Sequence, residues 1–340
     1  MNTAAPWIAR QTEQLLAQRG HAWLLQGPSG LGQYDLALAL ASAWLCEQPT
    51  AQGACGQCPS CHAIAVRTHA DLAVLMPETQ MLALGWPLTE KAQADIDDKK
   101  RKPSKEIRVE AMRDVVEFAQ RTDARGRGKV VLVYPAERMN AVTANALLKT
   151  LEEPPGDVRF VLATEAAHQL LPTIRSRCQT HTLAWPEPAE AMAWLATQSV
   201  EAPVAEALLR SAGGRPSDVM RQSAAGLSPA WWAQLPKAMQ QGDASHLSDL
   251  SPAQAIDALQ KLCHDLVLRS IGAEPRFFMA SQLPACQAPV MALTDWFKRL
   301  MQSARTAEHP FNAGLMLEAL ANDAQQALMS RGASRDAARA

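Results

Sequence analysis

The sequence GPSGLGQY occupies residues 27–34, one residue after an apolar run at residues 22–25 and before a helical pattern at residues 35–45. A phosphate-binding loop reads G-x-x-x-x-G-K-[ST]: glycines let backbone N–H groups surround the phosphates, the Lys meets their charge, and the hydroxyl holds Mg²⁺. Here Gln33 stands in place of the Lys and Tyr34 in place of the Ser or Thr. The stretch predicts the scaffold of a nucleotide-binding domain without its catalytic groups.

The glycines of this loop, Gly27, Gly30 and Gly32, keep the turn. The alternative interpretation is a glycine-rich strand-to-helix turn with no relation to nucleotides, since such turns are common. The sequence does not show whether the loop still binds a nucleotide without hydrolysing it.

Length and charge limit the classes of protein. The 340 residues suffice for two or three domains. A formal net charge of -1 provides no global positive field, so any contact with DNA must be local or shared with partners. No apolar run reaches the roughly 18 residues of a membrane span, and the N-terminus lacks signal-peptide features. We therefore expect a cytoplasmic protein with no membrane partner.

Four of the seven cysteines fall in one pattern, C-x8-C-x2-C-x2-C, with glycines and a proline between them. Thiolates two residues apart on a tight turn can point at one ion, and two such pairs suit a closed, structural Zn²⁺ site. A redox dithiol is the alternative, although redox C-x2-C motifs usually come as one pair. His62 and His69 are nearby, and we do not select either as a ligand. The predicted metal ligands are Cys46, Cys55, Cys58 and Cys61.

Apolar runs alternate with helical patterns beyond the cysteines. Strands are predicted at residues 71–75, 129–133, 159–164 and 179–183, with helical apolar faces at 107–119 and 143–151. Such alternation indicates a parallel sheet covered by helices on both faces. In an ATPase the strand at 129–133 would end in two acids, one for Mg²⁺ and one to activate water, but Tyr134 and Pro135 follow it here.

Between residues 77 and 106 the signal for ordered elements fades. Residues 95–106 are mostly charged and include the basic run 99–102. We interpret them as a solvated loop with self-cancelling charge rather than as a contact to the DNA backbone, because adjacent acids dilute the field within a Debye length of ~8 Å.

Several motifs together resemble the clamp-loader branch of the AAA+ ATPases. They are the loop at 27–34, the four cysteines, the block NALLKTLEEPP at 145–155 and the triplet Ser176-Arg177-Cys178. The last two are specific in combination, and the resemblance covers residues 27–178, a little under half of the chain. It implies an α/β AAA+ parallel-sheet domain with a zinc-module insertion, then a small helical lid and an all-α collar.

The resemblance implies domain limits as well. The AAA+-like domain would span 1–184, with the zinc module at 46–61 and an insertion at 77–106. The lid would span 185–225 and the collar 226–332, before a flexible tail at 333–340. Within the last two domains, helices are predicted at 191–196, 203–211, 252–271 and 311–329. The isolated cysteines are expected to be buried thiols: Cys178, Cys263 and Cys286.

In the clamp-loader family the arginine of the Ser-Arg-Cys triplet enters a neighbour's nucleotide site, and here that residue is Arg177. A guanidinium can offer two N–H groups to phosphoryl oxygens and stabilise the charge of transfer. From the residue alone, an ion pair with a carboxylate on its own surface is an equal alternative. Thr164 fits the family's first sensor, whereas Pro216 falls near the position of the second sensing arginine and Arg215 is displaced.

The resemblance therefore implies a subunit of the bacterial DNA polymerase III clamp loader that does not hydrolyse ATP itself. It would complete a pentamer with motor (gamma/tau) and delta subunits, which bind the ATP, and would reach primed DNA and the sliding clamp through that complex. Two alternatives remain: an autonomous ATPase with an unusual loop, and a freestanding zinc-ribbon adaptor that binds DNA.

Overall fold

The computed structural model describes residues 5–285, 288–307 and 312–330. The predictions for Cys286 and for the tail at 333–340 lie outside these residues. The chain forms two compact units, Met1–Glu190 and Ala191–Ala340.

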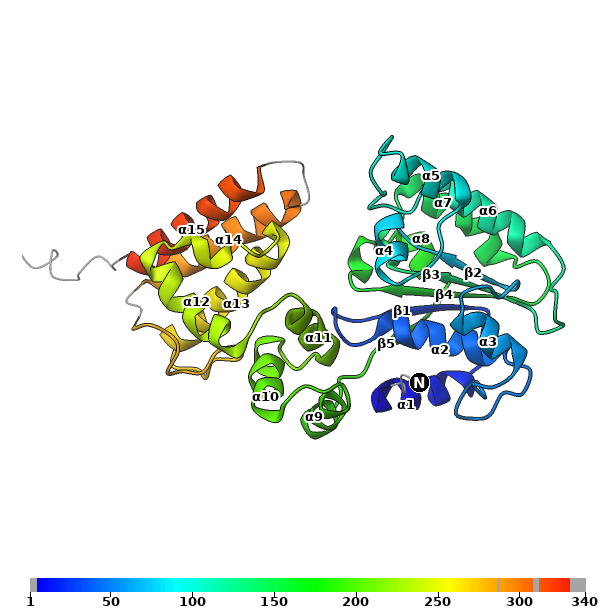
Figure 1. Ribbon diagram of the computed structural model, residues 1–340, viewed down its shortest axis with the longest axis horizontal. Coiled ribbons are helices and arrows are strands. Elements are labelled where there is room, and N and C mark those ends of the chain that lie inside the picture. Colours follow the sequence, from blue (N-terminus) through cyan, green and yellow to red (C-terminus); the bar gives the residue numbers. More distant parts are fainter. Residues whose placement is uncertain (1–4, 286–287, 308–311, 331–340) are drawn as a thin grey trace, which may run out of the picture. The chain divides into compact units, whose positions relative to one another are not determined.

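The first unit contains the predicted parallel sheet, in the strand order β2-β3-β4-β1-β5 (Figure 1). Every strand pairs in parallel with its neighbours, so the carboxyl ends of all strands lie at one edge. The five strands are β1 (Ala22–Gln26), β2 (Leu72–Leu75), β3 (Lys129–Val133), β4 (Val158–Thr164) and β5 (Gln179–Thr182). The predicted α/β sheet is confirmed.

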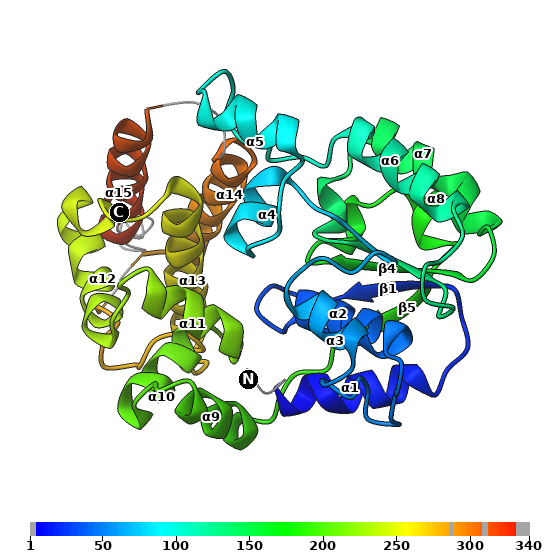
Figure 2. The same ribbon diagram turned by 45° about the vertical axis from the view of Figure 1, so that its right-hand side comes forward.

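Alternate residues of the central strands enter two separate cores. Val131 and Phe160 pack in one cluster with helices α6 and α7, whereas Val130 packs with Ala41 and Ile64 of α2 and α3. Figures 1 and 2 show α1 and α2 on one face of the sheet and α6 and α7 on the other. The helices that cover the sheet are α1 (Pro6–Leu16), α2 (Gln33–Leu45), α3 (Pro59–Ala65), α6 (Val109–Gln120), α7 (Ala141–Glu152) and α8 (Pro172–Arg175). Short 3-10 turns lie at Ala136–Arg138 and Ala167–Gln169.

The structure contains ordered elements between residues 77 and 106, where the signal in the sequence fades, and the solvated loop predicted at 95–106 begins only after Asp97. Two short helices lie there, α4 (Glu78–Ala83) and α5 (Glu90–Asp97), and neither contains a buried residue. A helix without a buried stripe shows no apolar periodicity, which explains why the pattern was missed. Within the basic run the charge is self-cancelling as expected, but Arg101 pairs with Glu78 and Asp95 and its side chain is only 23% exposed.

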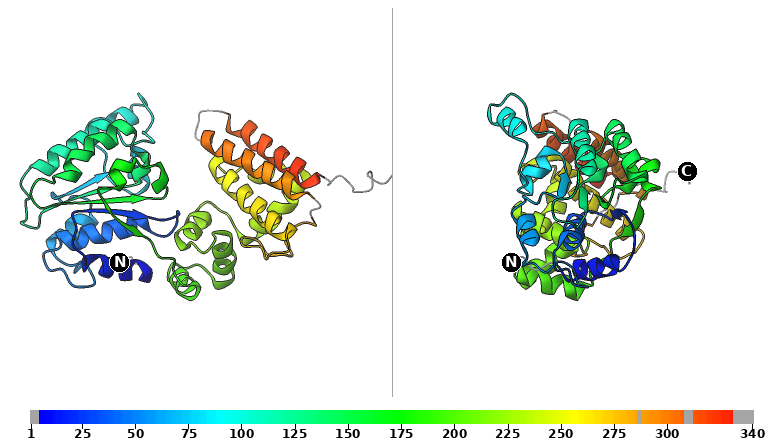
Figure 3. Two further views of the ribbon diagram at one scale, coloured as in Figure 1. Left: turned by 180° about the vertical axis from the view of Figure 1, so that it is seen from behind. Right: turned by 90° about the vertical axis from the view of Figure 1, so that its right-hand side faces the viewer.

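The second unit is helical and has one continuous buried cluster. The predicted helix after Ser251 is confirmed with its cap: the Ser251 side chain accepts the backbone N–H of Gln254, whose side chain accepts in return. Helices α13, α14 and α15 lie side by side (Figure 3). The helices are α9 (Pro188–Thr197), α10 (Ala202–Ser211), α11 (Pro216–Ala224), α12 (Pro229–Gln241), α13 (Pro252–Ser270), α14 (Val290–Thr306) and α15 (Ala313–Met329), with a 3-10 turn at Ala244–Leu247. The division into lid and collar stays a prediction.

Among the described residues, no helix is both long enough and apolar enough to cross a bilayer.

Candidate functional site

Residues 27–32 connect β1 to α2 at the carboxyl edge of the sheet, and the side chain of Gln33, the first residue of α2, folds back onto this loop. Gln33 is 2% exposed. Its Nε2 donates to the carbonyl oxygens of Gly27 at 2.8 Å and Pro28 at 2.6 Å. A Lys at this position would direct a charge to a phosphate, whereas this amide satisfies the loop's own carbonyls.

The loop is also fixed from outside by α1. The indole nitrogen of Trp7 donates to the carbonyl oxygen of Leu31 at 3.0 Å, and both side chains are buried. Gly32 has a φ of 96°, and a Cβ there would lie 2.8 Å from the Cδ1 of Ile8. A side chain at position 32 would be strained at this φ, and its Cβ would require the Ile8 side chain to move.

Tyr34, which replaces the Mg²⁺-binding hydroxyl, lies against Tyr134, which replaces the first acid after β3. The ring centroids are 5.5 Å apart, with an interplanar angle of 35°. Trp86, in the segment 77–106, donates from Nε1 to the Tyr34 hydroxyl oxygen at 2.7 Å. Arg67 donates to the same oxygen at 3.1 Å and places its guanidinium 4.4 Å from the Trp86 ring centroid. We call these four residues the tyrosine cluster.

The residue proposed as the first sensor is buried beside this edge. Thr164 donates from its hydroxyl to Oε2 of Glu137 at 2.6 Å, and the backbone N–H of Glu165 donates to Oε1 of the same carboxylate at 3.2 Å. In the second unit, Arg215 pairs with Asp218, with 3.1 Å between Nε and Oδ2. Thr164 and Arg215 each have a partner within their own unit.

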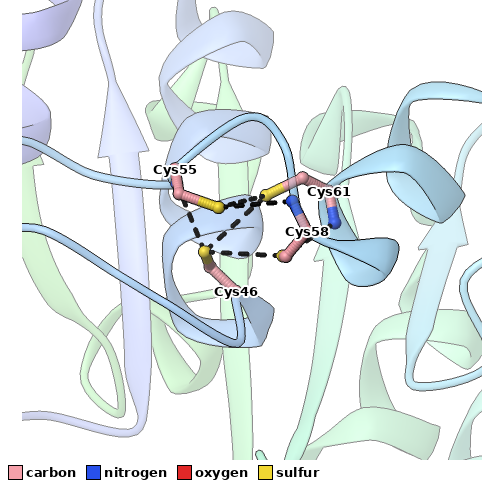
Figure 4. A group of neighbouring side chains, drawn as sticks. All are labelled: Cys46, Cys55, Cys58 and Cys61. Carbon is pink, nitrogen blue, oxygen red and sulfur yellow. Dashed lines mark hydrogen bonds between the residues drawn. The ribbon is translucent and has the colours of Figure 1, made fainter.

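The four predicted metal ligands come together (Figure 4), with their ligand atoms all within 4.8 Å of one another. The Sγ atoms of Cys46 and Cys58 are 3.8 Å apart, those of Cys55 and Cys61 3.9 Å, and those of Cys61 and Cys46 3.7 Å. A tetrahedral site with Zn–S bonds of about 2.3 Å places its sulfurs roughly 3.8 Å apart, whereas a disulfide bond needs about 2.05 Å. The sulfurs are therefore spaced for one shared metal ion.

Backbone N–H groups support these sulfurs. Cys55 N donates to Sγ of Cys46 at 3.3 Å, and Cys61 N donates to Sγ of Cys58 at 3.4 Å. Burial alone would raise the pKa of the Cys58 thiol, but the backbone N–H groups of Cys61 and Glu47 and the neighbouring thiols outweigh burial and lower this pKa to about 6. Such outer contacts orient metal ligands. Burial raises the pKa of the Cys46 thiol and raises that of Cys61 to about 12.

Neither nearby histidine joins the cluster. His62 is exposed, and His69 accepts the backbone N–H of Asp71 on its Nδ1 at 3.1 Å. The Glu47 carboxylate instead links the cysteine module to the rest of the unit, because it accepts from Ser60 Oγ and from Arg125 at 2.8 Å each.

Arg177 follows α8, between two residues that anchor the backbone. Ile174 and Cys178 are buried in the same cluster, while the Arg177 side chain is 30% exposed. Its Nε donates to Oε1 of Glu152 at 2.6 Å, its Nη2 donates to the same oxygen, and its Nη1 donates to the carbonyl oxygen of Thr173 at 2.8 Å. The surface ion pair that the sequence analysis gave as an alternative is therefore present within this single chain.

Of the three isolated cysteines predicted to be buried, Cys178 and Cys263 lie among the described residues, and both are buried. Burial raises the pKa of Cys178 to about 12, and Cys263 donates to the carbonyl oxygen of Leu293 at 3.2 Å.

Sequence reasoning missed Arg67, Trp86 and Glu152. The first two meet Tyr34 from segments 33 and 52 residues away in the chain. Glu152 lies within the block 145–155, but its pairing with Arg177 depends on how α7 and α8 pack. No local signal in the sequence reveals any of these contacts.

The family model described as "DNA polymerase III, delta subunit" matches residues 8–187. The DNA polymerase III subunit delta' of Pseudomonas aeruginosa is 40% identical over 220 residues, which cover 64% of this chain and 60% of that protein. The Escherichia coli K12 protein of the same name is 38% identical over 216 residues, with 61% and 58% covered. The chain thus spans about three fifths of the length of these two relatives.

A relative with a different subunit name matches over a shorter region. The DNA polymerase III subunit tau of Salmonella typhimurium is 35% identical over 158 residues, covering 46% of this chain and 21% of that protein. Among solved structures, a gamma subunit-related protein of Thermotoga maritima aligns over 94% of this chain and 99% of its own, with 15% identity and a TM-score of 0.47.

Proposed function

Since the chain belongs to the family of DNA polymerase III delta subunits, with delta-prime subunits as relatives, we propose that it is a non-hydrolysing subunit of the clamp loader. It completes a pentameric ring with gamma/tau motor subunits and a delta subunit. That ring uses ATP, bound by the motor subunits, to load the sliding clamp onto primed DNA. The chain itself binds no membrane and acts in the cytoplasm.

The observation that best supports the non-hydrolytic role is that the chain's own side chains occupy the loop and its surroundings. Gln33 bonds to the loop's own carbonyls, and the tyrosine cluster occupies the positions where the Mg²⁺-binding hydroxyl and the acid would stand. Phosphoryl transfer depends on Mg²⁺ and on positive charge around the phosphates, and these substitutions remove both. An autonomous ATPase is therefore disfavoured.

The active contribution of the chain is Arg177, offered in trans as an arginine finger to the ATP site of a neighbouring motor subunit. Three features support this role: the triplet Ser176-Arg177-Cys178, the buried anchors on both sides, and a guanidinium that remains partly exposed. A guanidinium in such a position stabilises the charge that develops on the transferred phosphoryl group.

The cysteine cluster is a structural Zn²⁺ site in this proposal. Its four thiolates fill a tetrahedral coordination sphere, so no position is open for water or substrate. Zinc would hold the module between α2 and α3 in its fold. A freestanding DNA-binding adaptor would need an electropositive surface, for which the overall charge of -1 gives no support.

The experiment that tests the proposal is reconstitution of the clamp loader by omission. Motor and delta subunits of the same organism are assembled with and without this chain, and ATP turnover is measured with primed DNA and clamp. We expect the chain alone to turn over no ATP and the ring to need it for DNA-stimulated turnover and clamp loading. Motor-like turnover by the purified chain, or full loading without it, would contradict the proposal. Strong salt-sensitive DNA binding by the isolated chain would favour the adaptor instead.

A further inference from the structure

The carboxylate of Glu152 holds the guanidinium of Arg177 along one edge. Glu152 is the last residue of α7 and Arg177 follows α8, so the contact joins the ends of two helices that pack together. Nε and Nη2 of Arg177 both donate to Oε1 of Glu152, and Nη1 donates to the carbonyl oxygen of Thr173.

The contact leaves donors for a further ligand. A guanidinium carries five N–H donors, and three are used within the described part of the chain: Nε–H, one on Nη1 and one on Nη2. One N–H therefore remains on each terminal nitrogen. Two such donors are what bidentate recognition of phosphoryl oxygens requires.

The exposure of the pair argues against a role in stability alone. The side chains of Arg177 and Glu152 are 30% and 46% exposed, and exposed ion pairs contribute little to folding. A long side chain that is already held in one geometry loses little conformational entropy when it binds a ligand. This favours a reaction that depends on the orientation of that side chain.

We infer that Glu152 is a positioning residue: it holds Arg177 extended and oriented so that the two remaining N–H groups face the phosphoryl oxygens in the neighbouring subunit's ATP site. This inference rests on the proposed function of Arg177. Glu152 touches neither ATP nor the reacting atoms and acts through Arg177. The competing role is a latch, in which Glu152 withholds Arg177 from the neighbour.

The test uses the reconstituted ring with Glu152→Ala, Glu152→Gln, Arg177→Ala and the double variant Glu152→Ala/Arg177→Ala. Glu153→Ala is the matched control, because Glu153 is an adjacent, exposed carboxylate. Turnover of ATP is measured against ATP concentration, and assembly is checked by size-exclusion chromatography. We expect Glu152→Ala to lower kcat toward the Arg177→Ala value with KM for ATP little changed, Glu152→Gln to lie between, and the double variant to equal Arg177→Ala.

The outcomes separate the inference from the proposal beneath it. If Arg177→Ala lowers kcat while Glu152→Ala matches wild type, the positioning role is overturned and the proposed function stands. If Glu152→Ala raises kcat, the pair is a latch and the inference is likewise overturned. If Arg177→Ala has no effect in an assembled ring, the proposed function itself fails and the inference fails with it. A fall with Glu153→Ala equal to that with Glu152→Ala would also overturn the positioning role, because it would show no dependence on the contact.

Discussion

The ring of Tyr34 lies against the ring of Tyr134, with the two centroids 5.5 Å apart. Tyr34 lies in the first turn of α2, which follows the loop, and Tyr134 directly follows β3, after which an ATPase would carry its catalytic acid. The two departures noted separately in the sequence thus meet in one contact. The two tyrosine rings pack against each other beside the loop, and Trp86 of the segment 77–106 donates a hydrogen bond to the Tyr34 hydroxyl.

We predict that the isolated chain does not bind ATP. A ligand at 100 times its Kd stabilises the folded state by about 2.7 kcal/mol, which raises the melting temperature by several degrees. With Gln33 bonded to the loop carbonyls, we expect millimolar MgATP to leave the melting temperature of the chain unchanged in thermal denaturation. A reproducible rise that depends on ATP concentration would show that the loop still holds nucleotide.

The tyrosine cluster predicts a stability effect at Trp86. Trp86 is 6% exposed and donates to the Tyr34 hydroxyl, so Trp86→Phe removes a buried hydrogen bond and part of the packing. We expect a loss of about 1–3 kcal/mol in the free energy of unfolding, measured by urea denaturation. Trp185→Phe is the matched control, because Trp185 is 45% exposed, and it should change stability by less than about 0.5 kcal/mol. Equal effects of the two substitutions would contradict the account of the cluster.

The cysteine site predicts bound metal. The purified protein should contain one equivalent of zinc by elemental analysis, and Cys58→Ser should lose most of it, because a tetrahedral site with three thiolates binds zinc more weakly. Cys263 is a buried cysteine of the second unit, and the control variant Cys263→Ser should retain the zinc. Wild-type protein purified without chelators that carries no metal would refute the zinc assignment.

The ion pairs of Glu78 predict a dependence on pH. Burial alone would raise the pKa of Glu78, but hydrogen bonds from Arg101 and Ser104 and the charge of Arg108 outweigh it and hold the pKa below its ordinary value of 4.5. A lowered pKa in the folded state stabilises the protein above pH 4.5, and this stabilisation is lost as the pH falls through the folded-state value. Glu78→Gln should therefore destabilise at pH 7, and its difference from wild type should shrink toward pH 3 in urea denaturation.

The control for this pH effect is Glu106→Gln, since Glu106 is exposed and its carboxylate has no ion pair among the described residues. A difference between Glu78→Gln and wild type that stays constant from pH 7 to pH 3 would exclude the ion pairs as its cause.

The sequence was most informative where local pattern and burial coincide. β3 is buried at every position, and a strand buried on both faces reads as a continuous apolar run. The cysteine spacing predicted the metal cluster for a similar reason, because ligands two residues apart on a turn come together with little help from tertiary contacts. The match of the family model over residues 8–187 confirms the resemblance.

The remainder depended on tertiary contacts. Helices α4 and α5 escaped detection because they bury no residue. Arg67, Trp86 and Tyr34 meet across long chain separations, and nothing in their local sequence specifies a partner. The pairing of Arg177 with Glu152 was foreseen only as a general alternative, because the sequence does not say which carboxylate would lie near the end of α8.

We propose that this chain contributes Arg177 to a neighbour's ATP site, and a comparison of two arginine variants examines that role. Rings reconstituted with Arg177→Ala and with Arg175→Ala are compared with wild type for DNA-stimulated ATP turnover. Arg175 is the matched control because it is an exposed arginine two positions away.

An arginine finger raises the rate of phosphoryl transfer ~10³–10⁵-fold at the ATP site that it enters. We predict that the Arg177→Ala ring assembles fully but loses the turnover of that site, whereas the Arg175→Ala ring matches wild type. Wild-type turnover by a fully assembled Arg177→Ala ring would contradict the account.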